Sequence, residues 1–346
     1  MRCWFVLALA GCGFHPSSGT SDAGGSDATG SDAPMTGSHT LTVDLGNTHD
    51  ELDDFPLLVQ LDSTRVVYAD VPDPTTGFTF TDASGATLEY DVDHWDPTGT
   101  SALWVRVPAI PTTGTTLTMT FGTGQHAASP LATWSQFTQV LHFDTPPVID
   151  SGGTAFAPMP TNVTAQVGQI GNAGAFAGSS SLVNFGAGTQ LYNGWSAFTL
   201  EFWLYLDYDS KPANGVNILN RGGSLAFGAY APQLDDGDFA ASWIFESTAN
   251  ETVAIPVSLK TWTHIAMTWD GSTITGWANG VLMSTNTFPY TTTLLSDPST
   301  DSFSLGMGFV GKLDELELDR NTAHLSPDWI PAEYKSQTDQ AITFSP

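Results

Sequence analysis

Asp314 is the residue with the clearest potential for metal chemistry in this sequence. It lies in the alternating run 313–318, where it shares parity with the leucines at the other even positions, so we expect it to point into a core. A buried carboxylate needs backbone N–H groups, a proton or a cation. Two interpretations stay open. Asp314 accepts hydrogen bonds from a neighbouring loop, or it binds a structural calcium ion (Ca2+) together with the loop acids Asp144 and Asp150.

Aromatic side chains offer a second kind of site, because sugar rings stack on exposed aromatic faces. Trp203 and Tyr205 face away from the leucines in the run 198–206, and Trp243 and Trp277 lie on other expected strands. These four side chains are the candidate ligand-binding residues. The alternative is that each of them packs beneath a covered sheet face.

Common catalytic motifs are missing from the chain. The sequence has no His-Glu-x-x-His zinc motif, no Gly-x-Ser-x-Gly elbow, no phosphate-binding glycine loop and no cysteine nucleophile. The acidic run 314–319 has the wrong order for the paired carboxylates of laminarinase-type glycosidases. In that run Glu315, Glu317 and Asp319 lie opposite Asp314 by parity, and we expect them to face solvent. The sequence therefore predicts no catalytic residues, with a polysaccharide-acting hydrolase as the alternative.

The first twelve residues indicate export. Arg2 precedes an apolar run at 4–10, which is shorter than the ~20 residues that span a bilayer and is typical of a signal peptide. The run ends in Leu-Ala-Gly-Cys at 9–12, which resembles the bacterial lipobox. This resemblance implies cleavage before Cys12, acylation of Cys12 and lasting membrane attachment. No Asp follows Cys12, so the resemblance implies the outer membrane of a Gram-negative cell, or the cell surface.

Composition limits the partners. The chain has 36 acidic and 9 basic residues and a formal net charge of -27, whereas phosphate backbones require clustered Lys and Arg, so nucleic acid is excluded. The sequence contains 2 cysteines. Lipidation of Cys12 and removal of Cys3 with the signal segment would leave the folded part without a disulfide.

Composition also divides the chain into segments. Residues 13–39 are rich in Gly, Ser, Asp and Ala, which predicts a disordered tether. Short alternating runs separated by turn residues then predict an all-β protein with two β-sandwich modules. We place the first module at 40–125, a joint at 126–138, the second module at 139–322, and a C-terminal helix and tail at 323–346.

The first module resembles a bacterial family called domain of unknown function 2341. The segments that carry the resemblance stand in the family's order: DFPLLVQL at 54–61, FTDASG at 80–85, YDVDHW at 90–95 and LWVRVP at 103–108. The family commonly precedes LamG-like modules on exported proteins. It implies a β-sandwich and brings no assigned activity.

The second module resembles the LamG-like jelly roll of the concanavalin A-like superfamily. The resemblance rests on FTLEFWLYL at 198–206, TWTHIAMTWDG at 261–271, ITGWANG at 274–280 and FVGKLDELEL at 309–318. Asn279 and Gly280 also favour a type I′ turn between two strands. Ser326, followed by Pro and Asp, predicts the start of a short helix running to about residue 335, with Trp329 and Tyr334 anchoring it on the sandwich.

These observations predict a surface-anchored, non-catalytic binding module for a glycan or another cell-surface polymer. The link from jelly roll to glycan is an analogy between folds. The alternative is an adhesion or architectural protein that binds protein partners. An exposed aromatic row would favour glycan, and a flat apolar edge would favour protein.

Overall fold

The computed structural model describes residues 37–346, with gaps at 47, 49, 146–147, 154–156, 188–196, 211–215, 222–226, 231–239, 247–249, 288–301, 307, 321–323 and 325. Within the strands, side chains are not described at 186–187, 217, 220–221, 227–230, 240–246, 250–252 and 302–303. Cys12 and tether positions 13–36 lie outside the described residues. No helix in the described part of the chain is long and apolar enough to cross a membrane.

The first module is a β-sandwich, as the sequence predicts. Its five-stranded sheet has the order β23 (Ile342–Ser345), β1 (Gly37–Val43), β7 (Thr115–Phe121), β3 (Phe78–Thr81) and β4 (Thr87–Leu88). The facing sheet has the order β2 (Leu52–Leu61), β6 (Ser101–Ile110) and β5 (Tyr90–His94). Two short 3-10 helices (Tyr68–Asp70 and Pro74–Thr76) and α1 (Pro130–Thr133) complete this part of the chain. Alternation builds the core, because the inward residues of β1 and β7 are apolar while the others are polar.

The strand β23 comes from the opposite end of the chain to its partner. It pairs antiparallel with β1, Thr40 opposite Ser345 and Val43 opposite Ile342. The backbone N–H of Asp44 extends this pairing by donating to the carbonyl of Ala341 at 2.8 Å. The sequence predicted a C-terminal helix and tail at 323–346 and no strand there, because four residues carry too little pattern to assign a sheet.

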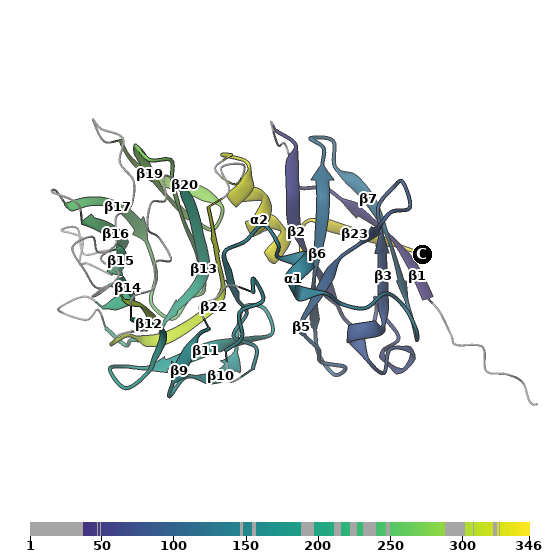
Figure 1. The fold of residues 1–346 in the computed structure, drawn as a ribbon, viewed down its shortest axis with the longest axis horizontal. Helices are drawn as coiled ribbons and strands as arrows, with labels where there is room; N and C mark the ends of the chain where they lie inside the picture. Colours follow the sequence, from purple (N-terminus) through teal and green to yellow (C-terminus); the bar gives the residue numbers. More distant parts are fainter. Residues whose placement is uncertain are drawn as a thin grey trace, which may run out of the picture. The chain divides into compact units, whose positions relative to one another are not determined.

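The second module is a jelly-roll sandwich of two antiparallel sheets (Figure 1). Within the described ranges, one sheet has the order β10 (Thr164–Val167), β11 (Asn172–Ala177), β22 (Val310–Asp319), β13 (Phe198–Leu206), β18 (Thr263–Trp269), β19 (Thr273–Ala278) and β20 (Val281–Thr287), with β8 (Gln139–Leu141) paired to β22. The other has the order β17 (Asn250–Pro256), β16 (Ala240–Glu246), β15 (Phe227–Tyr230), β14 (Asn217–Arg221), β21 (Ser302–Leu305), β12 (Leu182–Ala187) and β9 (Met159–Thr161).

The jelly-roll core forms between these two sheets. Leu200, Phe202, Leu204 and Leu206 all point into it from β13 and are at most 1% exposed, as the period-2 pattern of that strand requires. The predicted turn after β19 is also present, because Asn279 and Gly280 have φ of 50° and 73°, the left-handed values that a type I′ turn needs.

The helix α2 (Trp329–Gln337) lies between the two modules (Figure 1). It begins after Asp328, a little later than the sequence predicts. On one side Trp329 packs edge-on against Phe55 of β2, with ring centroids 5.2 Å apart. On the other side Tyr334 packs on Trp203 of β13 at 5.8 Å. The outer face of the jelly roll beneath α2 is therefore buried, whereas a free-standing sandwich would expose it.

Candidate functional site

A row of side chains crosses the outer face of the larger jelly-roll sheet, outside the area that α2 covers. Thr164 of β10 lies opposite Ala175 of β11. Lys312 of β22 lies opposite both Ala175 and Tyr205 of β13. The row ends at Trp262, whose ring centroid lies 5.4 Å from that of Tyr205. Tyr205, Trp262 and Lys312 are each half-buried, so the row is open to solvent.

A cleft of about 390 Å³ opens along this row. Its polar and aromatic lining consists of Asn162, Thr164, Gln166, Phe176, Tyr205, Asp207 and Lys312. This volume falls in the range of small-ligand sites, about 300–1,000 Å³. The lining offers amide, hydroxyl, carboxylate and ammonium groups beside two aromatic rings, which suits a ligand that has both polar and apolar faces.

Lys312 fixes the two rings of the row. Its Nζ lies 4.8 Å from the ring centroid of Tyr205 and 5.1 Å from that of Trp262, within the range of attractive cation–π contacts. Nζ also donates to the carbonyl of Val167 at 2.8 Å. The ammonium group is thus held between β10 and the aromatic pair, with its charge at the edge of the cleft.

Gly311 allows the strands beneath the cleft to pair closely. A Cβ atom at this position would lie 2.1 Å from the carbonyl oxygen of Tyr205, far inside van der Waals contact. Because Gly311 also lines the cleft, a side chain there would both push β22 from β13 and narrow the site.

The four predicted ligand-binding aromatics lie in different surroundings. Tyr205 lies in the cleft, as expected for a platform residue. Trp203 and Trp277 are 3% and 7% exposed, because the region around α2 covers their face of the sheet. Neither ring face is open to a ligand, contrary to the expectation. Trp243 lies on β16, and its side chain is outside the described residues.

Sequence analysis missed Trp262 as a candidate residue. It directly precedes β18, and the register pairs Thr263 with Leu204, which brings Trp262 beside Tyr205. The signal was present in the Trp-Thr-His segment, but only the pairing of β18 with β13 shows which aromatic it joins.

Asp314 is buried, but not for the predicted reason. The register between β13 and β22 shifts between Glu201 and Trp203, and Glu315 has a φ of 46°, so β22 contains a β-bulge there. The extra residue reverses the parity of the strand. Asp314 therefore lies opposite Trp203 on the outer face, and the prediction that it points into the jelly-roll core is wrong.

The cover over the outer face of the sheet overturns a second expectation. Glu315, Glu317 and Asp319 were expected to face solvent, yet they are 0%, 1% and 1% exposed. They lie on a face that α2 and the first module cover. Parity identified a polar face correctly, but the pattern of one strand cannot show what packs against it.

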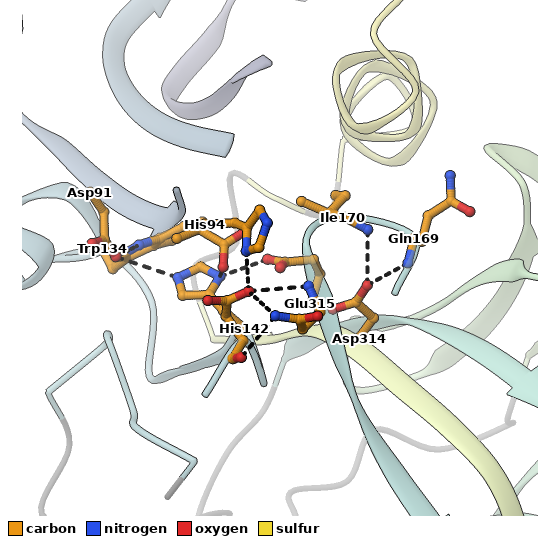
Figure 2. Close-up of polar contacts among 11 residues, drawn as sticks. Asp91, His94, Trp134, His142, Gln169, Ile170, Asp314 and Glu315 are labelled. Carbon is orange, nitrogen blue, oxygen red and sulfur yellow. Dashed lines mark hydrogen bonds and ion pairs between the residues drawn. The ribbon is translucent and has the colours of Figure 1, made fainter. Parts of the chain in front are cut away.

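Asp314 accepts hydrogen bonds from the backbone of a loop. Its Oδ2 receives the N–H groups of Gln169 at 2.8 Å and Ile170 at 3.0 Å (Figure 2). A Cβ atom on Gly168 would lie 2.4 Å from that oxygen, so the loop fits closely around the carboxylate. These contacts match the loop-capping interpretation, although Oδ1 has no hydrogen-bond partner.

The other two predicted calcium ligands are held elsewhere. Asp144 accepts hydrogen bonds from the backbone N–H and the side chain of Asn172 and pairs with His94. Asp150 accepts the backbone N–H groups of Val140 and Gly152. Two groups of three potential ligands lie close enough to hold one ion in the described part of the chain, and neither contains Asp314, Asp144 or Asp150. The predicted trio therefore does not come together as one site.

One of these groups lies where β5 of the first module meets the jelly roll. It consists of Asp93, His142 and Glu315, with His142 and Glu315 drawn in Figure 2. The Nδ1 of His142 lies 2.7 Å from Oε2 of Glu315 and 4.0 Å from Oδ1 of Asp93. A cleft of about 230 Å³ adjoins the group and is lined by Asp93 and His142.

The pKa values of all three groups are raised. Burial alone would lower the pKa of His142, but Glu315 and Asp93 outweigh it and hold that pKa well above its usual value. Burial raises the pKa of Glu315 to about 8 and that of Asp93 well above its usual range.

The second group consists of Glu201, Glu317 and Glu333, which come from β13, β22 and α2. Each is at most 1% exposed. Burial raises the pKa of Glu201 to about 8 and raises those of Glu317 and Glu333 well above their usual range. These carboxyl groups lie at the contact between the helix and the jelly roll.

Several solved structures resemble part of the chain. Domain 4 of AbnA, a GH43 extracellular arabinanase from Geobacillus stearothermophilus in complex with arabinotriose, is 17% identical with a TM-score of 0.45, covering 60% of this chain and 98% of that domain. The binding domain of Paraclostridial Mosquitocidal Protein 1 is 15% identical with a TM-score of 0.48, covering 59% of this chain and 52% of the other. The botulinum neurotoxin serotype D binding domain is 13% identical with a TM-score of 0.45, at 59% and 52% coverage.

The chain spans about half the length of the two toxin domains that it resembles. The TM-scores of these structures are too low for their ligands to be inferred for this chain. No curated protein matches the chain. Two family models match the chain. Residues 75–145 match domain of unknown function 2341. Residues 177–324 match the concanavalin A-like lectin/glucanases superfamily. The chain therefore carries a module of domain of unknown function 2341 followed by a concanavalin A-like jelly-roll module.

Proposed function

We propose that this protein is a non-catalytic binding protein of the cell surface that binds a glycan in the cleft beside Tyr205. The observation that carries the proposal is that Trp262 lies against Tyr205, and that Tyr205 lines a cleft together with hydrogen-bonding side chains. A sugar presents an apolar ring face and a rim of hydroxyl groups, so it can stack on an aromatic ring while its hydroxyls pair with polar neighbours.

Charge narrows the class of glycan. The chain has a formal net charge of -27, which repels a polyanionic polymer at long range. Within the cleft, Lys312 and Asp207 supply one cation and one carboxylate. The lining therefore has no excess of positive charge that could offset the repulsion of a polyanion. We therefore propose a neutral polysaccharide or oligosaccharide as the ligand.

Surface display belongs to the same proposal. The lipobox-like segment ending at Cys12 and the Gly- and Ser-rich sequence after it suit a lipid anchor followed by a flexible spacer. Labelling of cells with a radioactive fatty acid tests the anchor. Wild-type protein should incorporate the label and Cys12→Ala should not, whereas equal labelling of both would contradict lipidation at this position.

The binding experiment uses the full chain against a panel of neutral glycans, followed by calorimetry on the glycan that binds. Tyr205→Ala and Trp262→Ala should each weaken binding about tenfold, the effect of losing roughly 1.4 kcal/mol of stacking. Met283→Ala is the matched control, because Met283 is exposed on the distant strand β20. Unchanged affinity in Tyr205→Ala, or no binding to any neutral glycan, would rule out the proposed site.

A second candidate function is supported by one feature of β20. This strand stands at the edge of its sheet among the described strands, and Val281, Leu282 and Met283 are 57%, 51% and 42% exposed. Consecutive exposed apolar residues on an edge strand are typical of a protein contact by strand addition. A Leu282→Lys variant that loses a protein partner but keeps glycan affinity would support this second function.

A further inference from the structure

Asp93, His142 and Glu315 contain polar atoms that burial leaves without partners. The side chain of Asp93 is 1% exposed, and neither of its carboxylate oxygens has a hydrogen-bond partner. Oε1 of Glu315 also lacks one, on a side chain that is 0% exposed. A buried carboxylate without donors is costly unless a proton or a cation compensates it. His142 can balance the charge of one of these carboxylates, and the other then needs a proton or a cation.

The spacing of the three side chains suits a small ion. One ligand atom from each residue lies within 4.8 Å of the other two. The Nδ1 atom of His142 is 2.7 Å from Glu315 and 4.0 Å from Asp93. These separations bracket the roughly 3.3 Å between neighbouring ligands of a tetrahedral ion with bonds of about 2.0 Å. Small shifts of the two carboxylates would bring all three ligands onto one ion.

Asp91 orients the imidazole ring. Its Oδ2 lies 3.4 Å from Nε2 of His142 and accepts a hydrogen bond from the indole Nε1 of Trp134 at 3.0 Å (Figure 2). In the structure Nδ1 is 2.7 Å from Oε2 of Glu315, where it donates a hydrogen bond. When an ion displaces that proton, Nε2–H facing Asp91 leaves the lone pair of Nδ1 directed at the ion between Asp93 and Glu315. This carboxylate–histidine arrangement commonly fixes the tautomer of a metal-binding histidine.

One side of the cluster adjoins a cleft. Asp93 and His142 line the cleft of about 230 Å³, together with Asp144 and Thr145. The side chains of Asp93 and His142 are 1% and 9% exposed, so a small movement on this side would admit an ion and a fourth, water ligand, whereas Glu315 lies on the opposite side at 0% exposure. Three protein ligands and one open position form a known pattern for zinc.

We propose that Asp93, His142 and Glu315 bind a divalent transition-metal ion of the Zn2+ class. An imidazole nitrogen with two carboxylates favours such an ion over Ca2+, which takes oxygen ligands. The charge balance agrees, because three nearby carboxylates face a single imidazole and the chain has only 9 Lys and Arg residues in all. The site is separate from the glycan cleft and does not depend on the proposed function.

The ion joins the two modules. Asp93 is on β5 of the first module, His142 follows β8, and Glu315 forms the bulge of β22 in the jelly roll. A metal bond between these elements would hold the modules together in a chain that has 2 cysteines in total, at 3 and 12. Metal binding to the folded state alone raises stability by mass action.

The Glu201, Glu317 and Glu333 group provides a contrast. Its three members are all carboxyl groups, and none of them lines either cleft. Nε2 of His264 lies 3.3 Å from Glu201, but this imidazole is completely buried and is not among the three grouped ligands. Shared protons can compensate three buried carboxyl groups that adjoin no cleft. Glu317→Gln is therefore a matched control, because it removes a buried carboxylate of β22 near the proposed ligands without removing one of them.

The experiment uses untagged full-length protein that has been stripped with a chelator. After dialysis against Zn2+, elemental analysis should find about one ion per chain, and the melting temperature should rise by roughly 5 °C. Ca2+ and Mg2+ should produce no comparable shift. Co2+ should bind in place of Zn2+ and give the visible absorption of a four- or five-coordinate site.

Variants locate the ion. His142→Gln and Asp93→Asn should each lower Zn2+ affinity at least 100-fold, and Asp91→Asn should lower it about 10- to 100-fold. Glu317→Gln should bind Zn2+ like the wild type. If His142→Gln does not fold, the Zn2+ affinity of Asp91→Asn provides the test, since this variant keeps all three ligands. The proposal is overturned if the wild type retains no stoichiometric Zn2+, or if Asp93→Asn and Asp91→Asn both bind as tightly as the wild type.

Discussion

The indole Nε1 of Trp203 donates a hydrogen bond to Oε1 of Gln337, joining the outer face of the jelly roll to the last residue of α2. At the preceding residue, Oγ of Ser336 accepts the backbone N–H of Leu58 in the first module at 2.9 Å. A single helix end therefore connects both modules by hydrogen bonds. Because these atoms are buried, removing one partner leaves the other without a substitute.

The first prediction concerns this contact. Trp203→Phe should lower the free energy of unfolding by about 2–3 kcal/mol, because Oε1 of Gln337 loses its donor in a buried position and packing volume is lost. Urea denaturation of the full chain measures the change. Tyr205→Ala, two residues along β13 and half-exposed, serves as the control and should cost less. Equal stability of Trp203→Phe and the wild type would show that α2 does not depend on this side chain.

The second prediction concerns pH. Burial raises the pKa of Glu201 to about 8 from an ordinary value near 4.5, and raises that of Glu333 well above its ordinary value. Between these values the folded state binds more protons than the unfolded state, so stability falls as pH rises through this window. One such group loses roughly 2 kcal/mol over 1.5 pH units.

Thermal melts at several pH values test this prediction, and His264 sets the pH range that they should cover. Burial lowers the pKa of His264 to about 3 from 6.5, so its contribution has the opposite sign and is lost as pH falls below 6.5. Melts from pH 6.5 to 9 avoid this effect. The melting temperature should fall with rising pH in the wild type and fall less in Glu333→Gln, which cannot ionise. A parallel decline in both proteins would contradict a role for this carboxyl group.

The third prediction separates the two interpretations of Asp314. Asp314→Ala should destabilise the protein by about 1–3 kcal/mol with or without calcium, because the buried N–H groups of Gln169 and Ile170 lose their acceptor. Asp314→Asn keeps an acceptor oxygen and should cost less. Thermal melts with calcium and with EDTA provide the measurement. A calcium-dependent stabilisation of the wild type that disappears in Asp314→Asn would instead support the ion that the sequence analysis considered.

The fourth prediction concerns the last strand. Removing residues 341–346 exposes β1 as an edge strand and removes its hydrogen bonds to β23, each worth about 1 kcal/mol. The truncated protein should melt at a lower temperature and aggregate, as size-exclusion chromatography would show. Lysine at both Thr343 and Ser345, whose side chains are exposed, keeps the backbone pairing and should leave stability near that of the wild type. An unaffected truncation would mean that β23 is dispensable.

Much of the fold was predictable because it depends on local pattern. The period-2 leucines of 198–206 gave β13 with the predicted bounds, and the Asn279–Gly280 pair gave a turn with positive φ at both positions. The helix near Trp329 also formed. In these segments, propensity, alternation and turn chemistry agree, so no distant contact is needed to decide the structure.

The candidate sites were less predictable because they depend on contacts between distant residues. Asp314 changed face because of one extra residue in β22, and alternation cannot reveal such a bulge. Trp203 is covered by a helix more than a hundred positions later, while Trp262 comes to lie beside Tyr205 only through strand pairing. No local motif joins His142 to Asp93, because the two residues are far apart in the sequence and meet only in the folded chain.

The pairing of β23 with β1 also sets an order of folding. The sheet that begins at Gly37 is completed only by residues 342–345, so the first module cannot finish folding when its own segment leaves the ribosome or an export channel. The edge of β1 stays open until the whole jelly roll has followed. The modules therefore cannot be completed strictly one after the other, and the first module gains its last strand only after the jelly-roll segment has been synthesised.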